Sequence, residues 1–411
     1  MDNQFIMAIS YFIQILFLAL GLYYFVISIF AFIPRKEKER QIEKEHSFAL
    51  LVAAHNEESV IENMVESLNT QNYPRDKYEI FVIADNCTDA TASLAGAKGA
   101  QVFERFCMEK RGKGHALEWM FDQIFHMERE FDYVCVFDAD NIVQKDFLLE
   151  MNKQADKGHV AIQGYIDSKN PEDSWVSYSY SIAFWTINKL FQQSRYNLGL
   201  GCQLCGTGFA VTTKLLKEMG WGATCLTEDM EFTMKLALND VIVSWANDAI
   251  VYDEKPLTFS QSWKQRKRWM QGHADVASRF FFKLIKKSVK EKNLMPFDCA
   301  IYLLQPLRIV TMGVITIMGW IQATSPDSNL VVWGFVPTGI WSVVVVVQFA
   351  WGPLVLYTQN RFTKRTIWGY VPYIVYSLTW VPIAILGIAN KNNKEWFHTQ
   401  HTRKIRIEEM Q

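Results

Sequence analysis

The sequence lacks an excess of charge of either sign. Its 411 residues include 42 lysines and arginines against 43 aspartates and glutamates, so the formal net charge is -1. Binding to nucleic acid depends on a surplus of clustered cations, and we therefore do not expect nucleic acid as a partner. The length exceeds that of one ordinary hydrophobic core, which predicts more than one structural unit.

Cysteines are also few, and their spacing indicates neither a metal centre nor a disulfide framework. There are seven, an odd number, and Cys202 and Cys205 form one C-x-x-C pair. A structural zinc site would need a second pair or nearby histidines. We expect reduced cytoplasmic thiols.

Charged side chains are absent from Phe5 to Ile33, which is 29 positions. At about 1.5 Å per residue, such a helix crosses a hydrocarbon layer of roughly 30 Å. A signal peptide would have a shorter apolar core and a small-residue cleavage site, whereas "PRKEKER" follows here. We expect residues 1–45 to form a transmembrane helix with a basic flank, and the flank predicts a cytoplasmic location for the next segment. The flanking cations are Arg35, Lys36, Lys38 and Arg40.

A second apolar region, residues 296–390, is expected to form the transmembrane and channel part. It divides into stretches 297–323, 330–357 and 367–390, and the loop "TQNRFTKRT" between the last two carries three cations, which predicts a cytoplasmic position. Three full crossings would leave the charged tail, residues 391–411, outside, against the same rule. Either the last stretch, which contains Pro372 and Pro382, is re-entrant or hairpin-like, or the tail breaks the rule. The tail is too short for a further regulatory domain, so control by a cyclic dinucleotide is not expected.

Residues 46–258 alternate short β-rich runs with helical patterns. Four runs predict buried strands: "FALLVAA", "YEIFVIA", "YVCVFDA" and "VAIQGYI". Between the first two, the apolar residues of "EESVIENMVESLNTQ" recur at the spacing of one helical face. The alternation predicts an α/β domain with a mostly parallel sheet, whose ligands bind at the carboxyl ends of the strands.

Three of these strands end in polar clusters. The first is followed by "AHNEE", where Asn56 could cap a helix and the acids could complement its dipole. The second ends in "ADNCTDAT", with Asp85 and Asp89, and the third in "DADN". Asp138 and Asp140, one residue apart, repel each other unless a cation neutralises them. Mg²⁺ or Mn²⁺, which prefer oxygen ligands and share their shell with phosphates, is the expected partner.

Two further segments suit a phosphate ligand and a proton acceptor. In "EKRGKGHAL", Lys113 stands between two glycines at a predicted helix start, which suits either a phosphate site or a solvated basic loop. In "LTEDMEF", Thr227 could be an N-cap followed by first-turn acids. Alternatively, one carboxylate of Glu228 and Asp229 could remove the proton from an attacking hydroxyl.

A basic amphipathic helix is predicted over residues 259–295, and it carries "QRKRW". The alternation of cations with apolar residues is typical of a helix at a membrane interface. We expect Arg266 and Lys267 to face lipid headgroups. Gln265 and Arg268, three residues apart on one face, could instead bind a diphosphate.

Together, "DNCTD", "KRGKGHAL", "DAD", "CGTG", "TED" and "QRKRW" resemble the motifs of membrane-embedded family 2 glycosyltransferases. The likeness is greatest to processive synthases of cellulose, mixed-linkage glucan, hyaluronan and N-acetylglucosamine polymers. It covers residues 48–269 and implies a GT-A-like fold that binds a UDP-sugar, with a nascent glycan as acceptor and the lipid bilayer as surroundings.

The resemblance also implies a role for individual residues. Asp229 matches the base that deprotonates the acceptor hydroxyl, and Asp138 and Asp140 match the metal-binding pair. The nucleotide and its diphosphate would be held by Glu57, Asp85, Lys113, Asp138, Gln265 and Arg268. The acceptor pocket would include Cys205, Gly206, Thr207, Glu228 and Trp269, with Cys205 as a wall rather than a redox group.

The implied reaction is direct displacement with inversion, which needs one base, whereas a glycosidase needs two carboxylates. The expected product is a β-glycan, with UDP-glucose as the favoured donor because "CGT" is closer to glucan synthases than to hyaluronan synthases. The alternatives are an N-acetylglucosamine or hyaluronan polymer synthase, a single-sugar lipid glycosyltransferase, and a scaffold that retains a degenerate transferase fold.

Arg308 is the one cation in the three C-terminal apolar stretches. A charge inside the membrane is a candidate for function. Four aromatic residues could line a saccharide path or form interfacial belts. They are Tyr302, Trp320, Trp333 and Trp341.

Overall fold

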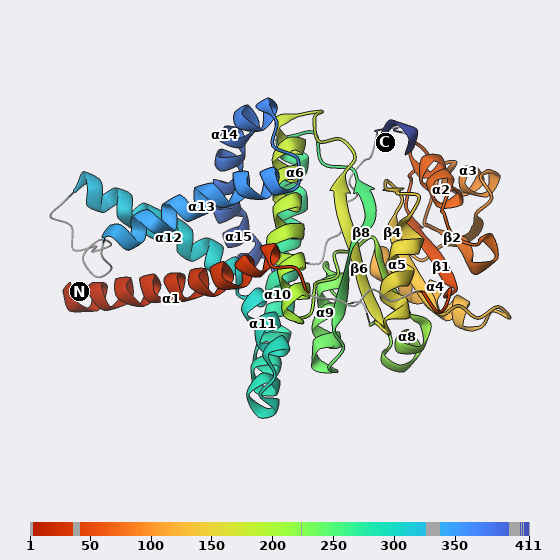
Figure 1. Ribbon diagram of the computed structural model, residues 1–411, viewed down its shortest axis with the longest axis horizontal. Coiled ribbons are helices and arrows are strands. Elements are labelled where there is room, and N and C mark those ends of the chain that lie inside the picture. Colours follow the sequence, from red (N-terminus) through yellow and green to blue (C-terminus); the bar gives the residue numbers. More distant parts are fainter. Residues whose placement is uncertain are drawn as a thin grey trace.

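The computed structural model describes residues 3–35, 42–222, 224–325, 338–393, 403, 405 and 407–410. An α/β domain occupies one end of the molecule, and a bundle of long helices extends from its side (Figure 1). The expected basic flank at Lys36, Lys38 and Arg40 lies outside the described residues, as does Trp333.

A sheet of eight described strands forms the core of the α/β domain, in the order β3-β2-β1-β4-β7-β6-β8-β5. Strands β3, β2, β1 and β4 run parallel, whereas β7 runs antiparallel between β4 and β6. Strand β6 continues in parallel with β8, and the short β5 pairs antiparallel with β8. The strands are β1 Phe48–Ala54, β2 Tyr78–Asp85, β3 Gln101–Arg105, β4 Tyr133–Asp138, β5 Ile142–Val143, β6 Ala161–Ser168, β7 Phe209–Thr212 and β8 Val243–Asp253.

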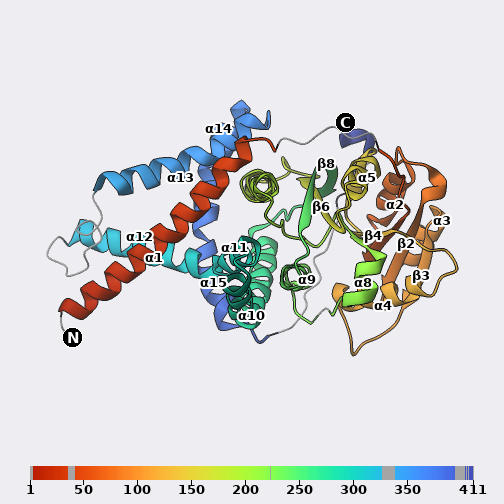
Figure 2. The ribbon, with the colours of Figure 1, turned by 60° about the horizontal axis from the view of Figure 1, so that its bottom comes forward.

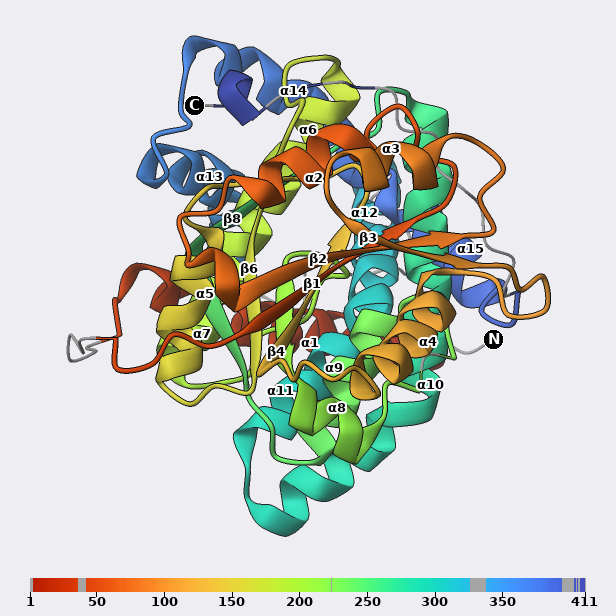
Figure 3. The ribbon, with the colours of Figure 1, turned by 90° about the vertical axis from the view of Figure 1, so that its right-hand side faces the viewer.

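The predicted α/β fold is confirmed, and β1, β2, β4 and β6 coincide with the four apolar runs of the sequence. These runs lack alternation because helices cover both faces of the sheet. Figure 3 shows α2 and α3 over one face, and α4, α8 and α9 over the other. The helices of this domain are α2 Ile61–Asn69, α3 Thr91–Ala97, α4 Lys113–Phe125, α5 Phe147–Asp156, α6 Trp175–Ile187, α7 Ser194–Leu198, α8 Thr213–Met219 and α9 Glu228–Leu238.

The expectation that Asn56 caps the first helix of the domain is wrong. Helix α2 begins five residues later, at Ile61, without a side-chain cap. Asn56 adopts a positive φ of 55° and its Oδ1 accepts a hydrogen bond from Thr88 N at 2.8 Å. Its amide therefore fixes the loop after β2 against the loop after β1.

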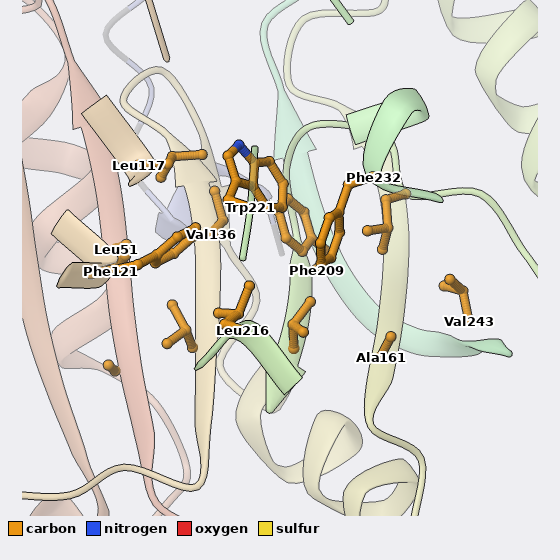
Figure 4. Packing of buried hydrophobic residues seen from close by; sticks show 14 of the residues in the cluster. Leu51, Leu117, Phe121, Val136, Ala161, Phe209, Leu216, Trp221, Phe232 and Val243 are labelled. Carbon is orange, nitrogen blue, oxygen red and sulfur yellow. The ribbon is translucent and has the colours of Figure 1, made fainter. Parts of the chain in front are cut away.

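Trp221 packs between β7 of the sheet and the helices α4 and α9. Its ring stacks on Phe209 of β7, with centroids 6.0 Å apart, and contacts Phe232 of α9 and Phe121 of α4 at 4.6 and 5.6 Å. Figure 4 shows Trp221 between Phe209 and the side chains of α4. Aromatic contacts of this kind bury large areas in fixed geometry, and they set the position of α9 relative to the sheet.

Helix α10, Phe259–Glu291, is 33 residues long and joins the α/β domain to the remaining helices. Thr258 and Gln261 form a capping box at its start. Helix α11, Leu294–Leu303, folds back along it, and α9 and α15, Trp380–Ala389, also pack against it. Because α10 packs against α9, α11 and α15, its residues are held by several elements at once.

Helices α1, Asn3–Ile29, α12, Gln305–Thr324, and α13, Thr338–Thr358, extend together away from the α/β domain (Figures 1 and 2). The predicted stretch 297–323 is divided, because α11 ends at Leu303 and α12 begins at Gln305. Among the described residues, three helical spans are long and apolar enough to cross a membrane: Gln4–Phe32, Gln305–Thr324 and Thr366–Ala389.

The last of these spans consists of α14, Lys364–Leu378, and α15, which are separated at Thr379. It runs across the direction of α1 in Figure 1. Contacts with the α/β domain flank both of its ends. Arg361 pairs with Asp167 before it, and Arg403 pairs with Asp173 at 3.0 Å after it. Thr379 thus divides the stretch into two helices, and Arg403 of the tail contacts the α/β domain.

Arg266 is fully buried, so the expectation that it faces lipid headgroups is wrong. Its guanidinium lies 4.0 Å from the ring centroid of Tyr376 and 5.0 Å from that of Trp380, and Nη1 donates to Thr379 Oγ1 at 2.8 Å. Position 266 falls on the face of α10 that α14 and α15 cover. Arg266 therefore fastens the junction of these two helices to α10 through cation–π and hydrogen-bond contacts.

We expect Asn393 to lie on the same side of the membrane as the α/β domain, and Ser325, at the end of α12, to lie on the opposite side. A green fluorescent protein or alkaline phosphatase reporter inserted at each position of the full chain measures this in a bacterial host. Opposite reporter behaviour is expected at the two positions. The same behaviour at both would contradict the arrangement.

Candidate active site

Lys113 lies at the centre of the polar cluster and begins α4. Its Nζ donates to the Asp138 carboxylate and to the carbonyl oxygen of Gly206, the latter at 2.7 Å. The Lys113 side chain is 19% exposed and that of Asp138 38%. Burial opposes the charge of Lys113, but Asp138 and Glu228 outweigh it and raise the Lys113 pKa. Lys113 therefore remains a cation and joins α4, β4 and the segment before β7.

The carboxyl ends of β2 and β4 meet at one edge of the sheet, because Ala53 of β1 is in register with both Ile83 and Asp138. Strand β4 ends at Asp138, and Asp140 follows in a turn, 3% exposed. Asn141 Nδ2 donates to Asp140 Oδ1 and to Asp253 Oδ1, both at 3.2 Å. The carboxylates of Asp140, which follows β4, and of Asp253, which ends β8, thus both bind the side-chain amide of Asn141.

These acids provide the oxygen donors that Mg²⁺ or Mn²⁺ prefers. Among the described residues, however, no group of three or more His, Cys, Asp or Glu side chains surrounds one point. Asp138 is already paired with Lys113, which leaves Asp140 as the main protein ligand of the expected pair. The residues fit a divalent ion whose remaining ligands are substrate phosphates and water.

The acids of "LTEDMEF" lie in the first turn of α9, as predicted. Thr227 stands at the N-cap position, but its side chain makes no capping bond. Asp229 Oδ1 accepts a hydrogen bond from Met230 N at 2.8 Å. Burial, reinforced by the charge of Glu228, raises the pKa of Asp229 to about 7, and burial also raises that of Glu228. A carboxyl group in this range can exchange a proton near neutral pH.

The third acid of the turn has the opposite environment. Glu231 accepts two hydrogen bonds from Arg279 of α10, at 2.9 and 3.0 Å, and further bonds from Thr224. Although burial alone would raise it, these bonds lower the pKa of Glu231 to about 2. Glu231 therefore stabilises the contact of α9 with α10, a role that the sequence did not indicate.

Residues of "QRKRW" approach the acids because α9 and α10 pack closely. A Cβ at Gly272 would lie 2.5 Å from Thr227 Oγ1, so the start of α9 needs glycine at this position of α10. Arg268 lies one turn earlier on α10, and its positive charge opposes the rise in the pKa of both Glu228 and Asp229. The arginine therefore lies close to the proposed base.

Gln265 and Trp269, one turn apart, face α6. Tyr180 OH donates to Gln265 Oε1 at 2.6 Å. The Trp269 ring centroid is 5.9 Å from that of Tyr180 and 6.3 Å from that of Phe184. Trp269, which the resemblance places in the acceptor pocket, is thus part of an aromatic wall.

The segment Cys205, Gly206 and Thr207 lies against this cluster. Gly206 has a φ of 78°, and a Cβ there would lie 3.4 Å from Asp229 Oδ2, so the segment passes next to the proposed base. Thr207 Oγ1 donates to Asn141. Gln163 of β6 accepts from Cys205 N and donates to Thr207 O, at 2.8 and 2.9 Å. Gln163 is another residue that motif spacing missed.

No disulfide joins the seven cysteines, all of which lie within the described residues. All seven are free thiols. Burial raises the pKa of Cys205 to about 12, and Asp229 acts in the same direction. A thiol of this pKa is a poor nucleophile, which agrees with a wall rather than a redox group.

The residues expected to hold the nucleotide lie at the ends of β1 and β2. Asp85 is buried and pairs with Arg105 of β3. Glu57 is also buried, and its backbone N donates to Thr91 Oγ1 at 2.8 Å. His55 Nδ1 lies 2.6 Å from the carbonyl oxygen of Asp85. Arg105 is a missed partner, because its position on β3 gave no motif signal.

The aromatic and charged candidates of the membrane region lie in different surroundings. Trp320 is 67% exposed, as expected of a belt residue, whereas Trp341 is buried and stacks on Phe17 of α1. Arg308 lies 4.6 Å from the ring centroid of Tyr24 and donates to Gln305 at 3.0 Å.

Tyr302 lies nearest to the polar cluster. Its ring centroid is 4.9 Å from that of Phe191 and 5.1 Å from that of His273. Burial raises the pKa of Tyr302, and the charge of Asp229 acts in the same direction. Of the described path candidates, Tyr302 is the one electrostatically linked to the proposed base.

Comparison with protein families gives a match to the model described as "Glycosyltransferase like family 2", over residues 46–272. The chain is 28% identical over 253 residues to the probable glycosyltransferase YdaM of Bacillus subtilis, with 59% of each chain covered. It is 31% identical over 238 residues to the β-monoglucosyldiacylglycerol synthase of Synechocystis sp., covering 54% of this chain and 47% of that one. The chain thus spans about half the length of these relatives.

A longer alignment joins the chain to the poly-β-1,6-N-acetyl-D-glucosamine synthase of Staphylococcus epidermidis. The two are 27% identical over 305 residues, which is 72% of this chain and 71% of that one. Among solved structures, the mannosyltransferase PcManGT of Pyrobaculum calidifontis, in complex with GDP-Man and Mn²⁺, has a TM-score of 0.61. It covers 94% of this chain and 99% of its own at 18% identity, a likeness of fold alone.

We expect Asp229→Asn to stabilise the protein at pH 8 and Glu231→Gln to destabilise it. The raised pKa of Asp229 means that the fold disfavours its carboxylate, at a cost that is full above about pH 7 and shrinks toward the unfolded pKa near 4. The melting temperature of Asp229→Asn should exceed that of the wild type by about 1–3 °C at pH 8, and by less at pH 5.

Glu231→Gln is the matched control from the same helical turn. The lowered pKa of Glu231 gives stability that is present above about pH 4 and is lost as the pH falls toward 2. Its loss should lower the melting temperature at both pH 5 and pH 8, because charge-assisted hydrogen bonds are worth about 1.5–3 kcal/mol. Scanning calorimetry measures both variants. Equal shifts in the same direction would contradict the assignment.

Proposed function

Because the family match covers more than half of the chain, the protein belongs to the family 2 glycosyltransferases, and from this premise we propose that it transfers a sugar from a UDP-sugar to the end of a growing β-glycan. The transfer is metal-dependent and inverts the anomeric configuration. One observation carries this proposal. The half-buried carboxyl group of Asp229, whose pKa is raised to about 7, lies against the segment at Gly206 and near enough to Lys113 and Arg268 for their charges to act on it.

In this proposal Asp229 accepts the proton of the acceptor hydroxyl while the hydroxyl oxygen of the acceptor attacks the anomeric carbon of the donor sugar. The bond from that carbon to the diphosphate oxygen breaks on the opposite face, and UDP leaves with the electron pair. Lys113 and Arg268 stabilise the developing diphosphate charge through preorganised electrostatics. No second carboxylate nucleophile is required, which distinguishes the reaction from retaining glycoside hydrolysis.

Asp140 would be the main protein ligand of Mg²⁺ or Mn²⁺ against the diphosphate, with Asp138 beside it. The ion would supply Lewis-acid stabilisation of the leaving group. Asp85 and Glu57 would bind the nucleoside at the ends of β2 and β1. The fold neighbour PcManGT was solved with a nucleotide sugar and Mn²⁺, which supports this division of roles without fixing the base or the sugar.

A polymeric product is favoured over a single transfer by the extent of one alignment. The similarity to the poly-N-acetylglucosamine synthase covers 72% of the chain, against 54% for the glucosyldiacylglycerol synthase. Helices α12 and α13 extend beside α1 and could carry a chain across the bilayer, with the catalytic domain on the cytoplasmic side. Among donors we retain UDP-glucose and place UDP-N-acetylglucosamine beside it, because of this relative. Glycosylation of a diacylglycerol-type lipid is the second candidate function, supported by the relative with 31% identity.

The donor and product are tested with purified protein in lipid nanodiscs that contain Mg²⁺ or Mn²⁺. Radiolabelled UDP-glucose, UDP-N-acetylglucosamine and UDP-glucuronate are offered singly and in pairs, with EDTA and Asp229→Asn as controls. We expect high-molecular-weight β-linked product from one hexose donor, abolished by both controls. An organic-extractable product would assign lipid glycosylation instead, and no incorporation from any donor would overturn the proposal.

The pH dependence of kcat/KM tests the base. Because Asp229 must be deprotonated to accept a proton, kcat/KM should rise tenfold per pH unit below about pH 7 and level off above it. Asp229→Asn should lose at least about 10²-fold in kcat and the acid limb with it, while retaining UDP binding by calorimetry. A wild-type profile that is flat between pH 5.5 and 8 would assign the base to another group.

A further inference from the structure

The segment at Cys205 is held in place by a residue outside every sequence motif. Residues Asn188–Gln193 form a π-helical turn between α6 and α7. Such turns are rare and frequently accompany functional sites. Gln192, 1% exposed, lies at the end of this turn.

Gln192 contacts the segment 202–205 through its side-chain amide and its backbone carbonyl oxygen. Gln192 Nε2 donates to Gln203 O at 2.8 Å and to Cys205 Sγ at 3.2 Å, and Gln192 Oε1 accepts from Gln203 N at 3.0 Å. The Cys202 thiol donates to the Gln192 carbonyl oxygen at 3.4 Å. Gln192 thus pairs with the backbone of residue 203 as a neighbouring strand would, and fixes the segment three residues before Gly206.

Helix α7, which directly follows the π-helical turn, is bound to α11 and α1 by a buried charge cluster. Arg195 donates from Nε and Nη2 to the two oxygens of Asp298 on α11, at 2.7 and 2.9 Å, and both side chains are 1% exposed. The guanidinium carbon lies 3.5 Å from the ring centroid of Phe191. Tyr23 of α1 donates to Asp298 Oδ1 at 2.7 Å.

Stability alone does not explain this cluster. The desolvation of a buried ion pair roughly cancels its attraction, and an apolar pair of the same volume is often as stable. An apolar pair, however, lacks hydrogen bonds that fix the orientation of the two side chains. The forked guanidinium fixes the rotation and height of α11 and of α7 relative to each other, and the Tyr23 hydroxyl extends this registry to α1.

We propose that Gln192 is a positioning residue for the acceptor pocket and that Arg195, Asp298 and Tyr23 connect its position to the membrane helix α1. The proposal rests on the proposed function, because only there is the segment from Cys205 to Thr207 assigned to the acceptor. It identifies the route by which the seating of α1 in the bilayer affects acceptor binding.

The first test compares Gln192→Leu with Gln193→Leu in the full chain in nanodiscs. Gln193, its neighbour in the same turn, donates to Asn197 Oδ1 at 2.8 Å. Within the described residues, its side chain makes no hydrogen bond to the segment 202–205. With cellotetraose or chitotetraose as primer, Gln192→Leu should raise the primer KM at least about tenfold. Its kcat and donor KM should remain within about threefold of the wild type, as expected when a contact of the bound acceptor is lost. Gln193→Leu should match the wild type.

A second readout does not depend on activity. The half-buried Cys205 thiol accepts a hydrogen bond from Gln192 and should react slowly with N-ethylmaleimide, and Gln192→Leu should accelerate its alkylation, measured by peptide mass spectrometry. The fully buried Cys135 of β4 is the internal reference. If no donor supports transfer but Cys205 alkylation still rises, the proposed function fails and the positioning role stands. If both variants behave alike in alkylation and primer KM, the positioning role is overturned.

The link to α1 is tested by Tyr23→Phe, which removes only the hydroxyl. Tyr24→Phe is the matched control, because the Tyr24 hydroxyl also joins α1 to α11 but donates to the Ile301 carbonyl oxygen, at 3.2 Å. Tyr23→Phe should raise the alkylation rate of Cys205 severalfold, and Tyr24→Phe should not. Equal effects, or none from Tyr23→Phe, would overturn the link.

Discussion

The ion pair of Lys113 and Asp138 is the interaction on which the arrangement of the site depends. It brings the end of a parallel strand, the start of α4 and the carbonyl oxygen of Gly206 to a single ammonium group. The acids of α9 lie near enough for their charges to contribute to the Lys113 pKa. Without this cation, the carboxylates at the centre would repel one another in a medium that screens them poorly. The cation that holds the protein together here is also the one offered to a diphosphate.

Helix α9 shows how one turn serves both stability and chemistry. Glu231 is surrounded by donors from Arg279 and Thr224, and its carboxylate is favoured by the fold. Asp229, two residues earlier, is half-buried and accepts a hydrogen bond from Met230 N, and its carboxylate is disfavoured. The contacts of Trp221 and Glu231 stabilise the position of α9, and this stabilisation offsets the cost of ionising the Asp229 carboxyl group. A helix held less firmly would relax and let water or another donor satisfy that carboxylate.

The sequence predicted those features whose signals are local. Four strands were readable from apolar runs, and the acids of α9 and the cations of α10 from their spacing. The partners of Gln163, Gln192, Arg105 and Asp298 were not, because each bond joins residues separated by 11 to 103 positions. Arg266 was misassigned for a related reason, since a cation on an amphipathic helix has the same pattern whether lipid or two further helices cover it. The cap expected at Asn56 failed because the chain used that amide across two loops instead.

Helix α10 gives the membrane side and the site a common frame. Over five consecutive positions it directs Gln265 and Trp269 toward α6, Arg266 toward the junction of α14 and α15, and Arg268 toward the acids. A helix is stiff over one turn, so these side chains cannot move independently. Displacement of α15 would therefore shift Arg268 as well, and the close contact of Gly272 with Thr227 would carry the shift to α9. Because packed interfaces do not deform continuously, such a shift would be a step between two discrete packings rather than a gradual drift.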